Sequence, residues 1–226
     1  MEARESLIAL ERAKTEEVRL SNALLAIQGE SSLLDLAAKK LVYAKETATD
    51  WNGRVYTLGD VIGSNLARHC IETLGIWSRL DPKCGIEIIL NSPGGDALPG
   101  LALFDFIGEL RRRGHSITTH VLGCAASLAG VLLQAGERRV MGQGAFLLIH
   151  EISAQMGGKI GDIDDTSIFL KKLQTRMVDI YMERVQGKIS RAAFIHGCKR
   201  KDWWLSAEEC LKLGFIDEVW RPGARY

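Results

Sequence analysis

The spacing of apolar residues divides the chain into a helical N-terminal part and a longer part in which strands and helices alternate. Residues 1–29 are rich in good helix formers and contain no proline, and Gly29 is a residue type that suits a helix C-terminus. A second helical stretch is predicted over residues 33–44. The apolar positions form only a loose stripe, so the sequence predicts a helical appendage over residues 1–48 that is solvated or packed against a partner.

From Arg54 onward the chain alternates between short apolar runs and amphipathic stretches. A dense β-branched run is typical of a buried strand, whereas apolar residues three and four apart between Thr166 and Ile180 indicate a long amphipathic helix. The predicted strands are residues 54–58, 85–91, 116–122 and 145–152; the predicted helices are residues 64–78, 99–113, 127–134 and 166–185, with a short last helix that a Ser206–Glu209 capping box opens and Gly214 closes. This order predicts an α/β domain with a largely parallel sheet over residues 49–226.

Composition and charge narrow the functional classes only a little. The chain has 226 residues, of which 46% are hydrophobic and 25% charged, and its net charge of +1 gives no reason to expect nucleic acid as a partner. Five widely spaced cysteines form no C-x-x-C pair, which favours reduced thiols in a cytoplasmic protein over a metal or redox site. No apolar run approaches the ~20 residues that span a bilayer, so we expect no membrane segment.

Two segments carry groups suited to acyl-transfer chemistry. The turn from Asn91 to Gly95 follows a buried strand, and its glycines let backbone N–H groups approach a carbonyl oxygen that becomes an oxyanion. Ser127 lies among small residues where a strand gives way to a helix, which places its hydroxyl near the helix N-terminus. Each segment also has an ordinary interpretation, the first as a turn and the second as a helix N-cap.

A histidine and an aspartate complete the set of candidate residues. His150 ends an apolar strand, and it is either a satisfied core histidine or the base that takes the proton of Ser127. Asp202 precedes the last predicted helix and could orient His150 from a loop. Asp179 and Asp217 are rival carboxylates that spacing alone does not exclude.

In this order, these segments resemble those of the Clp protease proteolytic subunit, and the resemblance runs from about residue 54 to residue 219. The matching stretches are residues 91–95, 123–130, 148–150, 202 with 205–208, and 214–217. The resemblance implies an α/β fold of the ClpP/crotonase-like kind, a superhelix of repeated β-β-α units, here with an extra N-terminal helical segment. It also implies site roles: Ser127 is the nucleophile, His150 the general base, Asp202 the orienter, and the N–H groups of Gly95 and Leu128 the oxyanion hole.

The resemblance further implies a serine endopeptidase that cleaves unfolded polypeptides through an acyl-enzyme, with no metal or cofactor in the subunit. Members of the family stack two rings, commonly heptamers, around a chamber that an ATP-using unfoldase feeds. The long helix near residues 166–185 resembles the handle through which the rings join. We therefore expect a cytoplasmic homo-oligomer whose partners are peptide substrates and an AAA+ unfoldase.

The chain departs from the family pattern in two places. Family members often follow the catalytic histidine with Gln-Pro, whereas here residues 151–156 precede the pair Gly157-Gly158, which lengthens the link to the handle. Residues 1–48 do not resemble the usual axial-loop segment, so docking of a standard unfoldase stays open.

Three alternatives share the expected fold. They are a catalytically silent scaffold subunit, a crotonase-like acyl-CoA enzyme and a signal-peptide peptidase with a Ser–Lys dyad. The presence of Ser, His and Asp at all three matched positions favours the peptidase.

Overall fold

The computed structural model describes residues 16, 18–33, 35, 49–155 and 157–221. The chain divides into two compact units, residues 1–48 and 49–226. In the first unit the described residues are helical and exposed, and the helix continues through Gly29. The prediction that Gly29 ends the helix is therefore wrong, because a glycine weakens a helix by about 1 kcal/mol relative to alanine without stopping it. Most of the predicted stretch 33–44 lies outside the described residues.

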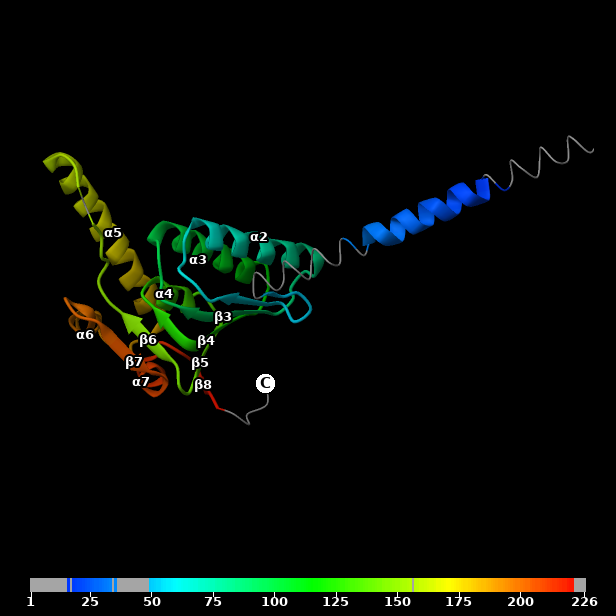
Figure 1. The fold of residues 1–226 in the computed structure, drawn as a ribbon. Coiled ribbons are helices and arrows are strands. Elements are labelled where there is room, and N and C mark those ends of the chain that lie inside the picture. The colour runs from blue at the N-terminus through cyan, green and yellow to red at the C-terminus, as the bar shows by residue number, and fades with distance from the viewer. Residues whose placement is uncertain (1–15, 17, 34, 36–48, 156, 222–226) are drawn as a thin grey trace, which may run out of the picture. The chain divides into compact units, whose positions relative to one another are not determined.

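In the second unit, the described residues form one eight-stranded sheet with helices packed on it (Figure 1). The strands are β1 Thr49–Asp50, β2 Val55–Leu58, β3 Ile86–Ser92, β4 Ile117–Ala126, β5 Arg138–Gly142, β6 Phe146–Ile149, β7 Trp203–Ser206 and β8 Glu218–Trp220. The helices are α2 Ser64–Leu80, α3 Ala97–Arg112, α4 Leu128–Leu133, α5 Ile160–Arg184, α6 Arg191–Cys198 and α7 Ala207–Leu213. All pairings are parallel except β1–β2 and β6–β7, which confirms the predicted α/β class with a largely parallel sheet.

Strand β4 is the branch point of the sheet. Its first half, Thr118–Val121, pairs with β5, and its second half, Cys124–Ala126, pairs with β6. The backbone turns between the two halves at Gly123, which has a φ of +89°, a value that side chains other than glycine rarely adopt. A Cβ at Gly123 would also collide with the Asn91 side chain, whose Oδ1 accepts a hydrogen bond from Cys124 N at 3.2 Å. The kink therefore directs the end of β4 toward β6.

In three helices, the buried faces and the capping residues explain the sequence patterns from which the helices were predicted. In α2 the buried residues Ala67, Cys70, Leu74 and Trp77 recur every three or four positions, so one face packs on the core. The capping box at Ser206 opens α7, and Gly214 closes it with a φ of +83°, as predicted. Only the C-terminal half of α5 is buried; its N-terminal half projects from the domain (Figure 1) and leaves Phe169 45% exposed.

Five elements, among them the two-residue strand β1, were not predicted, and three predicted boundaries were wrong; α5 begins at Ile160 rather than at residue 166. Strands β5, β7 and β8 and helix α6 lack a clear period; in β5 the charged pair Arg138-Arg139 hides the strand, since Arg139 is buried. Strand β6 ends at Ile149 rather than at residue 152, because its partner β7 begins opposite Ile149. Strand β4 runs on to Ala126, directly before Ser127.

The side chain of Arg139 joins β5 to the C-terminal ends of α4 and α7. It is 3% exposed and forms a two-bond ion pair with Asp217, with Nη2–Oδ1 at 2.5 Å and Nε–Oδ2 at 3.0 Å. Its Nη1 donates to Gln134 Oε1 at 2.8 Å and to the Gly214 carbonyl at 3.0 Å. Burial alone would raise the pKa of Asp217, but its hydrogen bonds with Arg139 hold this pKa below the usual range.

We expect Asp217→Asn to destabilise the fold, because it leaves Arg139 buried without its counter-charge. Breaking a buried pair costs about 3–5 kcal/mol. The Asp217 side chain is 41% exposed, so we expect a smaller loss of about 2 kcal/mol in the free energy of unfolding at pH 7. The difference from wild type should begin to shrink as the pH falls below about 4, where Asp217 takes up a proton in the unfolded chain, and it should disappear once the pH falls through the lower pKa of the folded state. Urea unfolding at fixed protein concentration measures both effects.

Asp179→Asn is the matched control, since Asp179 pairs with Arg191 at the surface. It should cost at most about 1 kcal/mol. Equal losses in the two variants would contradict the role assigned to the Arg139 pair.

Candidate active site

Ser127 occupies a strained turn between β4 and α4. Its φ of +54° and ψ of −121° lie outside the regions that residues other than glycine normally adopt, a conformation that costs about 1–3 kcal/mol. The backbone N–H of Ser127 donates to the Leu148 carbonyl at 2.9 Å, which ties the turn to β6. Although Ser127 is the N-cap residue of α4, its hydroxyl makes no capping hydrogen bond. The N-cap interpretation therefore does not explain this serine.

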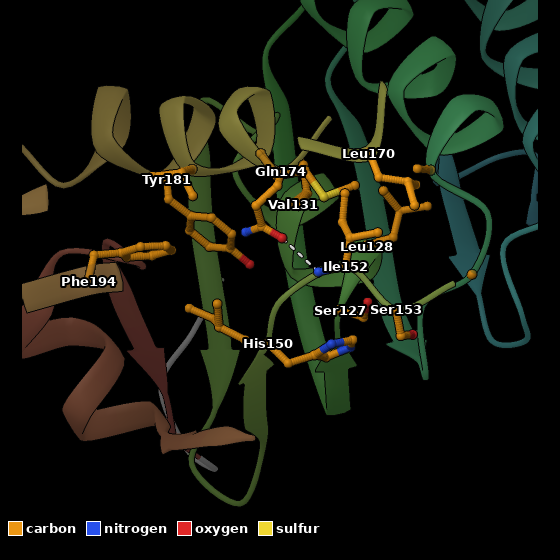
Figure 2. Close-up of a pocket in the computed structure, with 15 residues that line it drawn as sticks. Ser127, Leu128, Val131, His150, Ile152, Ser153, Leu170, Gln174, Tyr181 and Phe194 are labelled. Carbon is orange, nitrogen blue, oxygen red and sulfur yellow. Dashed lines mark hydrogen bonds between the residues drawn. The ribbon is translucent and has the colours of Figure 1, made fainter. Parts of the chain in front are cut away.

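Ser127 and His150 border the same pocket, which has a volume of about 210 Å³ (Figure 2). Its walls come from the start of α4, the end of β6, the segment after β6, and helices α5 and α6. Apart from these two residues, the lining is Gly95, Ala97, Leu128, Val131, Ile149, Ile152, Ser153, Leu170, Gln174, Met177, Val178, Tyr181 and Phe194. The pocket is thus mostly apolar, with Ser127, His150 and Ser153 at its more exposed end, the mouth, and with Gln174 and Tyr181 as its other polar side chains.

The two backbone groups predicted as an oxyanion hole also lie at this pocket. Gly95 is held by its neighbours: Ile62 N donates to the Gly94 carbonyl, and Asp96 N donates to the Ile62 carbonyl, both at 2.8 Å. Among the described residues, no backbone acceptor takes the N–H of Gly95 or of Leu128, which is the first residue of α4. Two N–H donors beside Ser127 are therefore left for a ligand oxygen.

His150 follows directly after β6, and Figure 2 shows its ring extending toward Ser127 and Ser153. Its Nδ1 lies 2.5 Å from the carbonyl oxygen of Glu151. Because a carbonyl only accepts, Nδ1 must carry the proton in this contact, and the lone pair of the neutral ring is then on Nε2. This tautomer is the one that a general base needs. No hydrogen bond between His150 and Ser127 is present among the described residues.

Asp202 and His150 lie directly beyond the paired ends of β7 and β6, and no hydrogen bond joins their side chains among the described residues. Ile149 pairs with Trp203 at the end of the antiparallel β6–β7 ladder, so His150 and Asp202 occupy the next register position. The Asp202 side chain is exposed and does not line the pocket. The rival carboxylates are engaged elsewhere: Asp217 pairs with Arg139, and Asp179 pairs with Arg191 at 2.6 Å.

Helix α5 lines the pocket with five residues that were not predicted to lie there: Leu170, Gln174, Met177, Val178 and Tyr181. Gln174 Oε1 accepts a hydrogen bond from Ile152 N at 2.6 Å, which holds the segment after His150 against α5 (Figure 2). Tyr181 closes the pocket further along the same helix face. The sequence does contain a pattern that could have indicated them. Leu170, Gln174, Met177 and Tyr181 are spaced by four, three and four positions, so they lie on one face of the helix.

The fold and this pocket together define the class of the molecule: an α/β protein of the ClpP-like kind. No helix in the described part of the chain combines the length and the apolar character needed to cross a membrane.

The chain belongs to the Clp protease family, whose sequence model matches residues 38–223. It is 31% identical over 168 residues to the ATP-dependent Clp protease proteolytic subunit 2 of Tropheryma whipplei (strain Twist), covering 74% of this chain and 90% of that relative. It is 29% identical over 168 residues to the ATP-dependent Clp protease proteolytic subunit of Deinococcus radiodurans, covering 74% of this chain and 79% of that relative. Membership places the chain among proteolytic subunits of the ClpP type, as the resemblance predicted.

We expect Gly95→Ala to lower peptide hydrolysis by roughly 10²–10³-fold, the usual effect of losing one oxyanion donor. Gly95 has a φ of +153°, and a Cβ there would collide with the backbone of Ile62, so the loop must shift. Gly108→Ala is the control, because a Cβ at Gly108 meets nothing within 4 Å. Steady-state hydrolysis of a fluorogenic peptide compares the two variants. Equal activities would show that the Gly95 N–H group does not act as an oxyanion donor.

Proposed function

We propose that this chain is a serine endopeptidase in which Ser127 is the nucleophile. The observation that supports it most is the position of Ser127. This residue has a strained backbone and a hydroxyl that makes no capping hydrogen bond, and it shares one pocket with His150 and with the N–H groups of Gly95 and Leu128, which have no backbone acceptor among the described residues. Strain is kept at a residue when the surrounding structure fixes it, and such positions cluster at active sites.

In the proposed mechanism, the Ser127 hydroxyl attacks the carbonyl carbon of a peptide while His150 Nε2 takes its proton. The N–H groups of Gly95 and Leu128 hold the oxyanion that forms. Collapse of the tetrahedral intermediate breaks the C–N bond, and His150 gives the proton to the leaving amine. Water then attacks the acyl-enzyme with His150 again as base, which releases the acid product and restores Ser127.

Asp202 is the proposed orienter of His150. Its position opposite His150 in the β6–β7 register brings the two backbones close, and its carboxylate is exposed and makes no hydrogen bond to a described residue. Rotation of this side chain toward Nδ1 would replace the Glu151 carbonyl with a charged acceptor. A carboxylate there stabilises the imidazolium that forms during acylation, which a neutral carbonyl does less well.

We further propose that the subunit works as a cytoplasmic ring assembly around a chamber, two stacked heptamers fed by an ATP-dependent unfoldase, with no cofactor of its own. The relatives are named as ATP-dependent proteolytic subunits. Apolar side chains on the projecting half of α5 support self-association: Ile160 is 81% exposed and Ile168 is 52% exposed.

A catalytically silent scaffold subunit is the second candidate, and one observation favours it. Among the described residues, no hydrogen bond links Ser127 to His150 or His150 to Asp202. Catalytic hydrogen bonds often tighten only when substrate binds, so this geometry does not exclude activity.

We expect a fluorophosphonate probe to label the wild type in a ring-sized species, and Ser127→Ala to abolish the labelling without changing the native size. Labelling read after native size-exclusion chromatography measures both. Continued labelling of Ser127→Ala would remove Ser127 as the nucleophile, and an unlabelled wild type would favour the scaffold.

Asp202→Asn should lower kcat by about 10⁴-fold, the effect of replacing a triad orienter in other serine peptidases. Asp179→Asn, which breaks only the surface pair with Arg191, should retain nearly full activity. Hydrolysis of one peptide by both variants tests the assignment. An active Asp202→Asn protein would show that the Glu151 carbonyl is sufficient to orient His150.

A further inference from the structure

The hydroxyl of Tyr181 is a buried polar group with no hydrogen-bond partner among the described residues. Tyr181 is 2% exposed, and its hydroxyl oxygen makes no hydrogen bond to any described residue. Buried tyrosine hydroxyls usually find a partner, so this one requires an explanation. Tyr181 lines the same pocket as Ser127, and Figure 2 shows its hydroxyl directed into the pocket.

The surrounding packing fixes the Tyr181 ring in this orientation. Its centroid lies 5.2 Å from that of Phe194 and 5.6 Å from that of Phe215, with the second pair edge to face. On the third side the hydroxyl lies against Gly130 of α4, where an added Cβ would overlap the hydroxyl oxygen. The hydroxyl therefore cannot reach solvent by a simple rotation, and a ligand in the pocket is the partner open to it.

The rest of the pocket interior offers little competing polarity. The walls near Tyr181 are Val131, Met177, Val178 and Phe194, which have no hydrogen-bonding side chains. The other α5 polar group, Gln174, already accepts a hydrogen bond from Ile152 N. The inner part of the pocket, termed the shaft below, is thus apolar except for the Tyr181 hydroxyl, and Ser127 lies at the mouth of the pocket.

Substrate geometry decides which group enters this shaft. Ser127 attacks the carbonyl of the residue on the N-terminal side of the cleaved bond, termed P1, so the P1 side chain is the part of the substrate next to the pocket. A volume of about 210 Å³ accommodates a long side chain. The lining has no acidic or basic residue except His150 at the mouth, which disfavours a charged P1 side chain.

We propose that Tyr181 is a specificity-determining residue that favours a long, uncharged P1 side chain with a hydrogen-bonding tip, of which glutamine is the type. The inference rests on the proposed function of Ser127 at this site. Burial, with smaller contributions from Cys210 and Cys198, raises the pKa of Tyr181 well above its ordinary value. The phenol is therefore neutral, and it both donates to an amide carbonyl and accepts from an amide NH₂.

The test compares the binding of two N-acylated peptides that differ only in the C-terminal residue, Gln or Met. Methionine has a similar length and shape but no comparable hydrogen-bonding tip. Calorimetry on the assembled Ser127→Ala protein gives a Kd for each peptide without cleavage. Adding Tyr181→Phe should lower the affinity for the Gln peptide relative to the Met peptide by roughly 3–10-fold, with the Met affinity nearly unchanged.

Tyr56→Phe in the same Ser127→Ala background is the matched control. Tyr56 is also fully buried, but its hydroxyl bonds to His69 Nδ1 at 2.6 Å and lies outside the pocket lining. This variant should leave the Gln-to-Met ratio unchanged. An unchanged ratio in Tyr181→Phe, an equal weakening of both peptides, or no binding of either peptide would overturn the proposal.

Because binding is measured without cleavage, the outcome is separate from that of the labelling experiment. A Tyr181-dependent preference for Gln in a protein that fluorophosphonate does not label would reject the nucleophile and retain the specificity pocket. Fluorophosphonate labelling of a protein that shows no Tyr181-dependent preference for Gln would retain Ser127 as the nucleophile and reject the specificity pocket.

Discussion

The placement of Ser127 depends on the change of partner along strand β4. If β4 continued straight, its second half would extend along β5, and Ser127 would end far from His150. The kink at Gly123, with the Asn91 side chain bonded to Cys124 N, turns that half onto β6 instead. Residues on neighbouring parallel strands then end at the same edge, and the Ser127 N–H can reach the Leu148 carbonyl. The nucleophile position and the histidine position are consequences of the same kink.

Much of the fold could be predicted from local pattern, because buried faces recur at helix and strand periods. The periodic face of α2, the capping box of α7 and the small residues around Ser127 are local signals of this kind. Strand β5 was missed because Arg139 is buried through an ion pair with Asp217, a residue 78 positions away that no local window includes. The β6–β7 pairing that brings Asp202 near His150 is equally non-local, and only the family resemblance favoured Asp202 over Asp179 and Asp217.

The site residues differ in how much the surrounding structure holds them. Ser127 is fixed by its turn and by its bond to Leu148, and the loop of Gly95 is fixed by two bonds to Ile62. His150 lies beyond the end of β6, where three hydrogen bonds restrain its segment: His150 Nδ1 to the Glu151 carbonyl, Ile152 N to Gln174 Oε1, and Arg200 N to Glu151 Oε2. Asp202 lies beyond the end of β7 and is exposed. The proposed nucleophile and oxyanion donors are thus preorganised, while the proposed base and orienter are held less firmly.

This difference has a physical consequence for control of activity. A preorganised oxyanion hole lowers the barrier only when the base has the right tautomer and orientation, and the segment that carries the proposed base, His150, is the link from β6 to α5. That link ends in a helix whose first half projects from the domain with exposed apolar residues such as Ile160. A partner that covers that half of α5 would therefore contact the element to which the His150 segment leads. In the proposed ring assembly, a contact between subunits on α5 and the proposed base His150 would then belong to one continuous stretch of chain, which would couple assembly to activity.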